Sequence, residues 1–198
     1  MSTFALKSQR PVWVVFPGLG GQWVGMAKAL MQIKIFADKI EECHQILKPY
    51  GIDLKEPLLS DDPNSLSTIT NKFCATTALE MALFDVLNAL DIIPDGIIGH
   101  SFGEIVAAYA DRCLTTEEAL LISYLRGSVV ANDKHIPKGL MAAVGISWSE
   151  AKKLCPKGVE VVCNNAKELV VVSGLNQKSV FSFELILYLF YRFRRSDD

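Results

Sequence analysis

The sequence has no surplus of positive charge, no long apolar run and no paired cysteines. Its 198 residues carry 20 Lys and Arg against 22 Asp and Glu, a formal charge of −2, which argues against a nucleic-acid-binding protein. The longest late apolar stretch, Leu185 to Tyr191, is far shorter than the ~20 residues that span a bilayer. The segment before Pro11 lacks the apolar stretch of a secretory signal peptide. These absences favour a cytoplasmic protein that binds neither nucleic acid nor membrane.

The cysteines offer neither a zinc site nor a disulfide framework. Their number is odd and none forms a C-x-x-C pair, so we expect reduced core or surface thiols and no bound metal. Half of the residues are hydrophobic and 21% are charged, which is enough to build a sizeable core. The five cysteines are Cys43, Cys74, Cys113, Cys155 and Cys163.

Strands and helices alternate along the first part of the chain. Val12–Phe16 is a continuous apolar run of the kind found in parallel strands that are buried on both faces. Asn71–Leu90 has apolar residues at helical spacing, and a short strand at Ile97–Ile98 precedes a helix over Ser101–Ala110. This alternation predicts an α/β domain with a parallel sheet, over residues 1–138.

The pattern changes after Pro137. Three strands and one short helix are predicted in the order β-α-β-β, which is part of a ferredoxin-like α+β unit. This partial small subdomain is predicted for residues 139–180, with Asn164-Asn165 as a turn between its last two strands. The strands are predicted at Leu140–Gly145, Val159–Cys163 and Leu169–Ser173, and the helix opens with the capping box Ser147-x-x-Glu150.

The motif that carries chemistry is Gly99-His100-Ser101-Phe102-Gly103. It fits G-x-S-x-G between a predicted strand and a predicted helix, which is the context of a nucleophile elbow. Such a turn holds the serine in strained dihedrals, and the glycines leave room beside it. The Ser101 hydroxyl then projects at a helix N-terminus, where free N–H groups favour a developing oxyanion. We predict that Ser101 is a nucleophile; a chance glycine-serine turn is the alternative.

A glycine-rich segment, Gly18-Leu19-Gly20-Gly21, follows the first strand. It does not fit G-x-G-x-x-G, because Trp23 stands at the third glycine position, and no Lys-Ser/Thr pair follows as in a phosphate-binding P-loop. We expect its backbone to approach Ser101 closely, and a helix to follow over Gln22–Lys39.

With Glu104 included, the elbow reads G-H-S-x-G-E, and here the sequence resembles the acyltransferase family of fatty acid and polyketide synthesis. It is most similar to the malonyl/acetyltransferase domain of animal-type fatty acid synthase. The resemblance runs from about Arg10 to about Val180. Its supporting segments are Val14–Trp23, Pro94–Ser101, Tyr124–Gly127 and Met141–Gly145.

The resemblance implies a ping-pong reaction in cytoplasmic fatty acid biosynthesis. Ser101 would be acylated by acetyl-CoA or malonyl-CoA and deacylated by the phosphopantetheine thiol of an acyl carrier protein. The other fatty acid synthase domains of the parent protein would be its partners. No cofactor would be bound by the domain itself.

The resemblance also implies roles for further residues. Gln22 and the backbone N–H of Phe102 would form the oxyanion hole. Arg126 would bind the free carboxylate of malonyl, which a guanidinium can hold bidentately; a solvated helix arginine is the alternative. His100 and Asn165 would contribute to substrate binding, Asn165 by lining the acyl pocket.

A base for Ser101 is missing from this pattern. His100 adjoins the serine, but neighbours on a tight elbow point apart, so we expect it to pack against the glycine-rich loop. His44 and His135 are predicted to be surface residues. The family's catalytic histidine lies beyond the matched segment, and residues 181–198 are interpreted as an aberrant hydrophobic tail. The chain is thus expected to be a C-terminally truncated domain without its base histidine.

Two other functions remain open at this point. A serine esterase or thioesterase of the α/β-hydrolase type shares the elbow, but Arg126, the glycine-glutamine loop and the ferredoxin-like part do not favour it. A non-catalytic remnant that at most binds acyl-CoA would account for the missing histidine.

Overall fold

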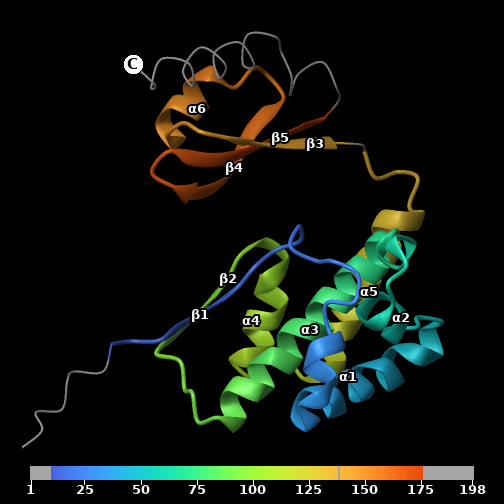
Figure 1. Ribbon diagram of the computed structural model, residues 1–198. Coiled ribbons are helices and arrows are strands. Elements are labelled where there is room, and N and C mark those ends of the chain that lie inside the picture. The colour runs from blue at the N-terminus through green and yellow to red at the C-terminus, as the bar shows by residue number, and fades with distance from the viewer. Residues whose placement is uncertain (1–9, 138, 176–198) are drawn as a thin grey trace, which may run out of the picture. The chain divides into compact units, whose positions relative to one another are not determined.

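The computed structural model describes residues 10–137 and 139–175, which form two compact units divided between Asp133 and Lys134 (Figure 1). The first unit combines a parallel sheet with helices, and the second is an antiparallel sheet with one helix. The boundary predicted between residues 138 and 139 lies a few residues further along the same connection. The predicted tail at residues 181–198 and the end of the predicted small subdomain lie outside the described residues.

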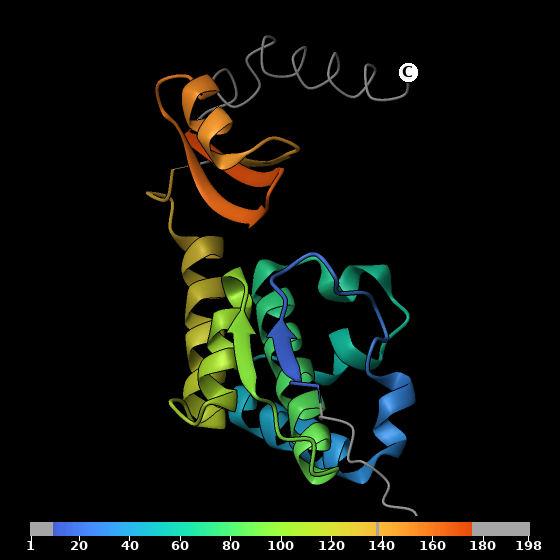
Figure 2. The same cartoon turned by 90° about the vertical axis from the view of Figure 1, so that its left-hand side faces the viewer.

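A pair of parallel strands forms the sheet of the first unit. Strand β1 (Trp13–Phe16) pairs with β2 (Gly96–Gly99), and Phe16 stands opposite Gly99 (Figure 2). The predicted parallel α/β arrangement is therefore confirmed for this unit. Since β2 ends at Gly99, the elbow motif begins where the two strands end together.

Helices and 3-10 turns pack against this sheet, but Trp13, Val15 and Ile98 are exposed. The expectation that the first strand is buried on both faces is therefore wrong. The longest helix, α3 (Ile69–Ala89), is capped by the Thr68 hydroxyl, which accepts from the Asn71 N–H. Helix α5 (Thr116–Asn132) begins with a capping box of Thr115 and Glu118. Both helices contribute to one core that also contains Phe16 and Phe102. The other elements are η1 (Lys28–Gln32), α1 (Lys34–Leu47), η2 (Lys48–Tyr50), α2 (Lys55–Leu59), η3 (Pro63–Leu66), η4 (Ser101–Gly103) and α4 (Glu104–Ala110).

The helix predicted from Gln22 begins later than expected. Turns and η1 occupy the chain as far as Gln32, and α1 starts only at Lys34. Gly25 adopts a left-handed conformation with φ of 71°, and Ile33 is extended. Neither conformation can continue an α-helix, so the prediction for residues before Lys34 was wrong.

Helices α3 and α5 approach each other closely because small and hydroxyl-bearing residues line their contact. The Thr77 and Ser123 hydroxyls lie 2.8 Å apart in the buried interface, and Ser123 donates to the Ala119 carbonyl. Gly127 faces Thr70, and a Cβ on this glycine would lie 2.7 Å from the Thr70 Cα. This close approach fixes the position along α3 at which the neighbouring residue, Arg126, projects from α5.

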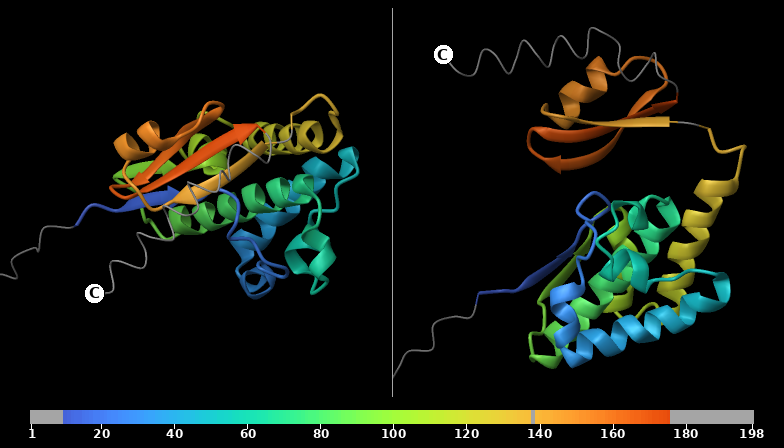
Figure 3. Two further views of the ribbon diagram at one scale, coloured as in Figure 1. Left: turned by 90° about the horizontal axis from the view of Figure 1, so that it is seen from above. Right: turned by 45° about the vertical axis from the view of Figure 1, so that its right-hand side comes forward.

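The second unit has the β-α-β-β order predicted from the sequence. Strand β5 lies between β3 and β4 in an antiparallel sheet, and α6 covers one face of it (Figure 3). Its own small core includes Val144, Ile146, Val170 and Val172. The elements are β3 (Gly139–Val144), α6 (Trp148–Leu154), β4 (Val159–Ala166) and β5 (Leu169–Leu175).

The turn predicted at Asn164-Asn165 is wrong. Strand β4 runs through both asparagines to Ala166, and the turn falls at Lys167-Glu168. The pairing register shifts between Asn164 and Ala166, so Asn165 is the extra residue of a β-bulge. The asparagine pair thus marks an irregular strand position and not the connection itself.

None of the helices within residues 10–137 and 139–175 is long and apolar enough to cross a membrane.

Candidate active site

Ser101 stands at a sharp turn between β2 and the η4–α4 segment. Its φ angle is +54°, a left-handed conformation that a non-glycine residue rarely adopts. The turn is closed by the Gly103 N–H, which donates to the His100 carbonyl at 2.9 Å. Ser101 is exposed, whereas Phe102 and Gly103 are buried beneath it. The strained serine predicted from the motif is therefore present, with its side chain on the accessible side of the turn.

The glycines of the motif are required because backbone approaches them from other segments. A Cβ on Gly103 would lie 2.6 Å from the Pro17 carbonyl oxygen and closer still to that of Phe16. A Cβ on Gly99 would lie 2.6 Å from the Glu104 nitrogen. Backbone atoms cannot move aside as a flexible side chain can. The first turn after the elbow is therefore packed directly on the end of β1.

The glycine-rich loop lies beside Ser101, which confirms the predicted close approach of its backbone. A Cβ on Gly18 would lie 3.1 Å from the Ser101 Cβ and 3.5 Å from the His100 Nδ1. Within the loop, the Gln22 Oε1 accepts a hydrogen bond from the Gly20 N–H at 2.7 Å. This bond holds the loop in shape through the Gln22 side chain.

The backbone N–H of Phe102 belongs to the first turn after Ser101. N–H groups in the first turn of a helix have no acceptor within the helix, so this group is available to an oxygen placed next to the serine hydroxyl. The Phe102 side chain points into the core and is 3% exposed. Its oxyanion-hole role, like that of Gln22, stays a prediction.

Arg126 lies over an aromatic pair that includes the residue after the serine. Its Cζ atom is 5.4 Å from the centre of the Phe102 ring and 5.9 Å from that of Phe73 on α3. The two rings are stacked, with centroids 4.2 Å apart. Arg126 is exposed, so its charge remains solvated while its guanidinium is oriented by the rings. The structure thus brings Arg126 and the elbow together through Phe102, a connection that sequence spacing did not reveal.

The remaining predicted residues lie elsewhere. His44 on α1 is partly buried, with its Nδ1 3.6 Å from the Asp53 carboxylate, so the prediction of a surface histidine was wrong for this residue. His135 is exposed in the turn before β3. Asn165 lies in β4 of the second unit, and its role in an acyl pocket stays a prediction.

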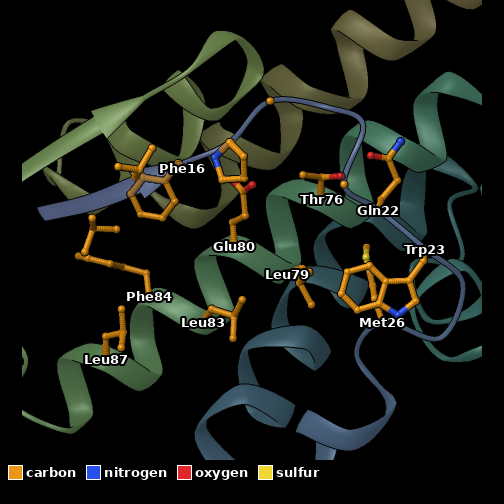
Figure 4. A pocket seen from close by; sticks show the side chains of 15 residues that line it. Phe16, Gln22, Trp23, Met26, Thr76, Leu79, Glu80, Leu83, Phe84 and Leu87 are labelled. Atoms are coloured by element: carbon orange, nitrogen blue, oxygen red, sulfur yellow. The ribbon is translucent and has the colours of Figure 1, made fainter. Parts of the chain in front are cut away.

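An apolar cavity of about 380 Å³ lies between β1, the glycine-rich loop and α3 (Figure 4). The α3 residues on its wall follow helical spacing, and Gln22, Trp23 and Met26 close the end next to the loop. Its other lining residues are Val14, Val15, Phe16, Pro17, Gly18, Gly21, Thr76, Leu79, Glu80, Leu83, Phe84 and Leu87.

A buried carboxyl group, Glu80, projects from α3 into this cavity (Figure 4). Glu80 is 7% exposed, and its Oε2 has no hydrogen-bond partner among the described residues. Burial raises the pKa of this carboxyl from 4.5 to about 8, because it disfavours the charged form. The sequence analysis missed Glu80, although an acidic residue within an apolar helix stripe was a visible signal.

The two buried cysteines and the possible metal ligands among the described residues do not contribute to the candidate site. Burial raises the pKa values of the Cys43 and Cys74 thiols to about 12, so both are inert core residues. No group of three or more His, Cys, Asp or Glu side chains in residues 10–137 and 139–175 is arranged to hold a metal ion.

The end of β2, the strained serine and the two closely packed glycines, Gly99 and Gly103, together define a nucleophile elbow on an α/β scaffold. The family model "Acyl transferase domain" matches residues 12–183. "Squalestatin hexaketide synthase clz14" of Cochliobolus lunatus is 37% identical over 163 residues, which are 81% of this chain and 6% of that protein. "Highly reducing polyketide synthase sphB" of Aspergillus fumigatus is 36% identical over 180 residues, covering 85% of this chain and 7% of that protein.

Solved structures agree with this assignment. The acyltransferase domain from the second module of the salinomycin polyketide synthase matches 90% of this chain with a TM-score of 0.77 and 28% identity. The acyl-carrier-protein S-malonyltransferase of Burkholderia pseudomallei matches 84% with a TM-score of 0.73 and 26% identity. The chain covers 41% and 56% of these structures, respectively.

The chain belongs to the acyl transferase domain family. The relatives named above are fungal polyketide synthases, so membership is shown for the family of synthase acyltransferases as a whole. The narrower prediction of an animal-type fatty acid synthase domain stays a prediction.

The first prediction concerns the contact of Gly103 with β1. Gly103→Ala places a Cβ against the Phe16 and Pro17 carbonyls, and we expect a loss of about 3 kcal/mol in unfolding free energy. Urea unfolding of the variant measures it. Gly21→Ala is the matched control, because no heavy atom lies within 4 Å of its added Cβ. Equal stability of the two variants would contradict the packing of the elbow on β1.

The second prediction follows from the Glu80 carboxyl. Its folded pKa of about 8 exceeds its ordinary value of 4.5, so the folded state binds the proton more tightly than the unfolded state does. Stability is therefore highest at low pH and declines as pH rises from about 4.5 to about 8. Between pH 5.5 and 8.5 we expect a loss of about 3 kcal/mol in unfolding free energy, measured by urea titration.

The control for this pH dependence is Glu80→Gln, which keeps the shape of the side chain and cannot ionise. The difference between the two pH profiles isolates the contribution of Glu80 from that of the histidines. Parallel profiles for the original chain and the variant would show that Glu80 ionises normally.

Proposed function

We propose that this chain is part of a domain that catalyses the acyl-loading step of a multidomain synthase, transferring acetyl or malonyl from coenzyme A to an acyl carrier protein through an acyl-serine intermediate. The observation that carries the proposal is the exposed Ser101 at φ +54° between two closely packed glycines, with Arg126 over the ring of the next residue. The family membership supports it, since S-malonyltransferase activity is named for a solved relative.

The proposed reaction of Ser101 has two steps, acylation by coenzyme A thioester and deacylation by the carrier protein. The Ser101 Oγ attacks the thioester carbonyl, the new C–O bond forms, and the C–S bond breaks. Coenzyme A leaves as a thiol that carries the proton lost by the serine. The phosphopantetheine thiol of the carrier protein then attacks the acyl-serine ester, and the serine regains a proton.

The negative charge of each tetrahedral intermediate needs donors beside Ser101. The Phe102 N–H supplies one, because it lies in the first turn and has no intrahelical acceptor. Gln22 has its carbonyl oxygen committed to Gly20, so its amide NH₂ group is the one that can donate. His100, against Gly18, borders the same space and is proposed to contact the substrate.

Arg126 is proposed to select malonyl by its carboxylate. The Arg126 Cζ lies 5.9 Å from the centre of the Phe73 ring and 5.4 Å from that of Phe102, and a guanidinium held there can bind a carboxylate bidentately. Asn165 is proposed to line the acyl pocket. An acyl carrier protein, both acyl-CoA substrates and the other domains of the synthase are the partners this reaction requires.

The parent protein is proposed to be a fatty acid synthase, on the resemblance of the elbow, the Val14–Trp23 segment and the Tyr124–Gly127 segment. A polyketide synthase is the second candidate, favoured by the 36–37% identity to fungal relatives of that kind. Both use the same loading reaction, so the proposed roles of Ser101 and Arg126 apply to either.

The third prediction concerns the acyl-serine intermediate. We expect radiolabelled malonyl-CoA or acetyl-CoA to acylate Ser101 alone, because the elbow exposes this hydroxyl to the solvent. Peptide mapping by mass spectrometry locates the label. In the complete parent domain, Ser101→Ala should lower transfer to carrier protein by orders of magnitude, since the covalent step is lost. A label on Cys113 or on another serine would refute the assignment.

The fourth prediction separates the two substrates. In the complete parent domain, Arg126→Ala should lower kcat/KM for malonyl-CoA by about tenfold or more, because the carboxylate loses a charge-assisted partner. Acetyl has no carboxylate, so its loading should change little. Steady-state transfer assays measure both, and an equal decline for the two substrates would rule out the proposed role.

A further inference from the structure

Two buried hydroxyl groups join α3 to α5, one helical turn of α5 before Gly127 (Figure 1). The Thr77 Oγ1 and the Ser123 Oγ lie 2.8 Å apart, and both residues are 0% exposed. Ser123 donates its single hydroxyl proton to the Ala119 carbonyl, so the Thr77 hydroxyl is the donor in the contact between the helices. We call Thr77 and Ser123 the hydroxyl pair.

A second contact between the two helices lies on the other side of Arg126. Gly127 faces Thr70, whose Cα would lie 2.7 Å from a Cβ on the glycine. Arg126 lies between the two contacts along α5, and Phe73 lies between them along α3. Helices that meet at one point can still rotate about it, whereas two contacts fix both their distance and their crossing angle. The hydroxyl pair and the Gly127 contact therefore set the position from which Arg126 reaches over the Phe73 ring.

The hydroxyl pair restrains α5 more sharply than apolar packing does. Apolar burial is non-directional, whereas a hydrogen bond weakens steeply when its distance or angle departs from the optimum. Because neither hydroxyl reaches water, a shift of α5 along α3 would break the bond between Thr77 and Ser123 without replacing it. The pair thus opposes the one motion that would displace the Arg126 guanidinium.

We propose that the hydroxyl pair is a positioning device for Arg126 and, through it, a determinant of the preference for malonyl over acetyl. This role rests on the proposed function of Arg126 in binding the malonyl carboxylate. A guanidinium that moves sideways loses the two parallel N–H···O bonds of bidentate carboxylate binding. Ser101 stays in place, since the packing of Gly103 on β1 holds its turn. Thr77 and Ser123 therefore affect one substrate and not the other, although neither needs to touch it.

The first measurement is the position of Arg126 in the 198-residue chain. The Arg126 Cζ lies 5.4 Å from the centre of the Phe102 ring, so the ring current shifts the NMR signal of the adjacent Nε–H proton. Thr77→Val nearly keeps the shape of the side chain and removes the hydroxyl. We expect this variant to change the Nε–H chemical shift, and Thr77→Ser, which retains the hydroxyl, to change it much less.

The second measurement is the substrate preference of the complete parent domain. We expect Thr77→Val to lower kcat/KM for malonyl-CoA about fivefold relative to kcat/KM for acetyl-CoA, and Thr77→Ser to restore the ratio. The loss should appear in KM for malonyl-CoA with kcat nearly unchanged, because the carboxylate takes no part in the bond changes. A variant that is merely less stable contains less active enzyme and lowers transfer of both substrates by the same factor. The ratio therefore separates positioning from a general structural role.

Thr76→Val is the matched control. Thr76 precedes Thr77 on α3 and is 7% exposed, and its Oγ1 has no hydrogen-bond partner among the described residues. The same atoms change as in Thr77→Val, but no hydrogen bond between α3 and α5 is lost, so the malonyl-to-acetyl ratio should stay the same.

Ser123→Ala removes the same hydrogen bond from the side of α5. It should lower the malonyl-to-acetyl ratio in the same direction, which provides a second variant if Thr77→Val does not fold. Since both substitutions break one bond, the double variant should change the ratio no more than either variant alone.

Three results would overturn the role of the hydroxyl pair. One is an equal decline of malonyl and acetyl transfer in Thr77→Val and Ser123→Ala. Another is a change of the ratio in Thr76→Val as large as that in Thr77→Val. The last is an unchanged Arg126 Nε–H signal in Thr77→Val.

Arg126→Ala separates this role from the proposed function. If Arg126→Ala lowers transfer of both substrates equally, the proposed carboxylate binding by Arg126 is wrong. If Arg126→Ala is selective against malonyl while Thr77→Val is not, only the role of the hydroxyl pair is rejected.

Discussion

The contact between Gly103 and the end of β1 is the constraint on which the site depends. Because no side chain separates them, the first turn after β2 lies directly on the Phe16 and Pro17 carbonyls. That position leaves Ser101 no ordinary conformation, and its φ of +54° is the result. The strain is local, but backbone from two strands that are distant in sequence maintains it.

The same turn links the serine to the helical layer. Phe102 directs its ring into the core, where it stacks on Phe73 of α3, and Arg126 of α5 lies over both rings. The close approach of α5 to α3 at Gly127 sets the position from which Arg126 projects. Ser101 and Arg126 are thus positioned by a shared aromatic pair, so a shift of α5 would move the guanidinium without moving the serine.

Sequence analysis predicted the features that depend on local chemistry. The elbow, the N-cap at Ser147 and the strand order of the second unit each follow from residue types at short spacing. The apolar pattern predicted a helix from Gln22, but the left-handed conformation of Gly25, ahead of α1, interrupts it. The aromatic support of Arg126 and the unpartnered Glu80 depend on which segments meet in space, and no local pattern encodes that.

The parallel pairing of β1 with β2 also has a consequence for the order of folding. Val12 and Asp95, joined by hydrogen bonds, are 83 residues apart in sequence, and closing so long a loop costs entropy before the pairing stabilises anything. Helices α1 and α3 lie within that loop and can form from local contacts first. We expect Ser101 to adopt its strained conformation only when β1 and β2 finally pair. During synthesis on the ribosome, Ser101 would then reach its final conformation after most of the surrounding core has already assembled.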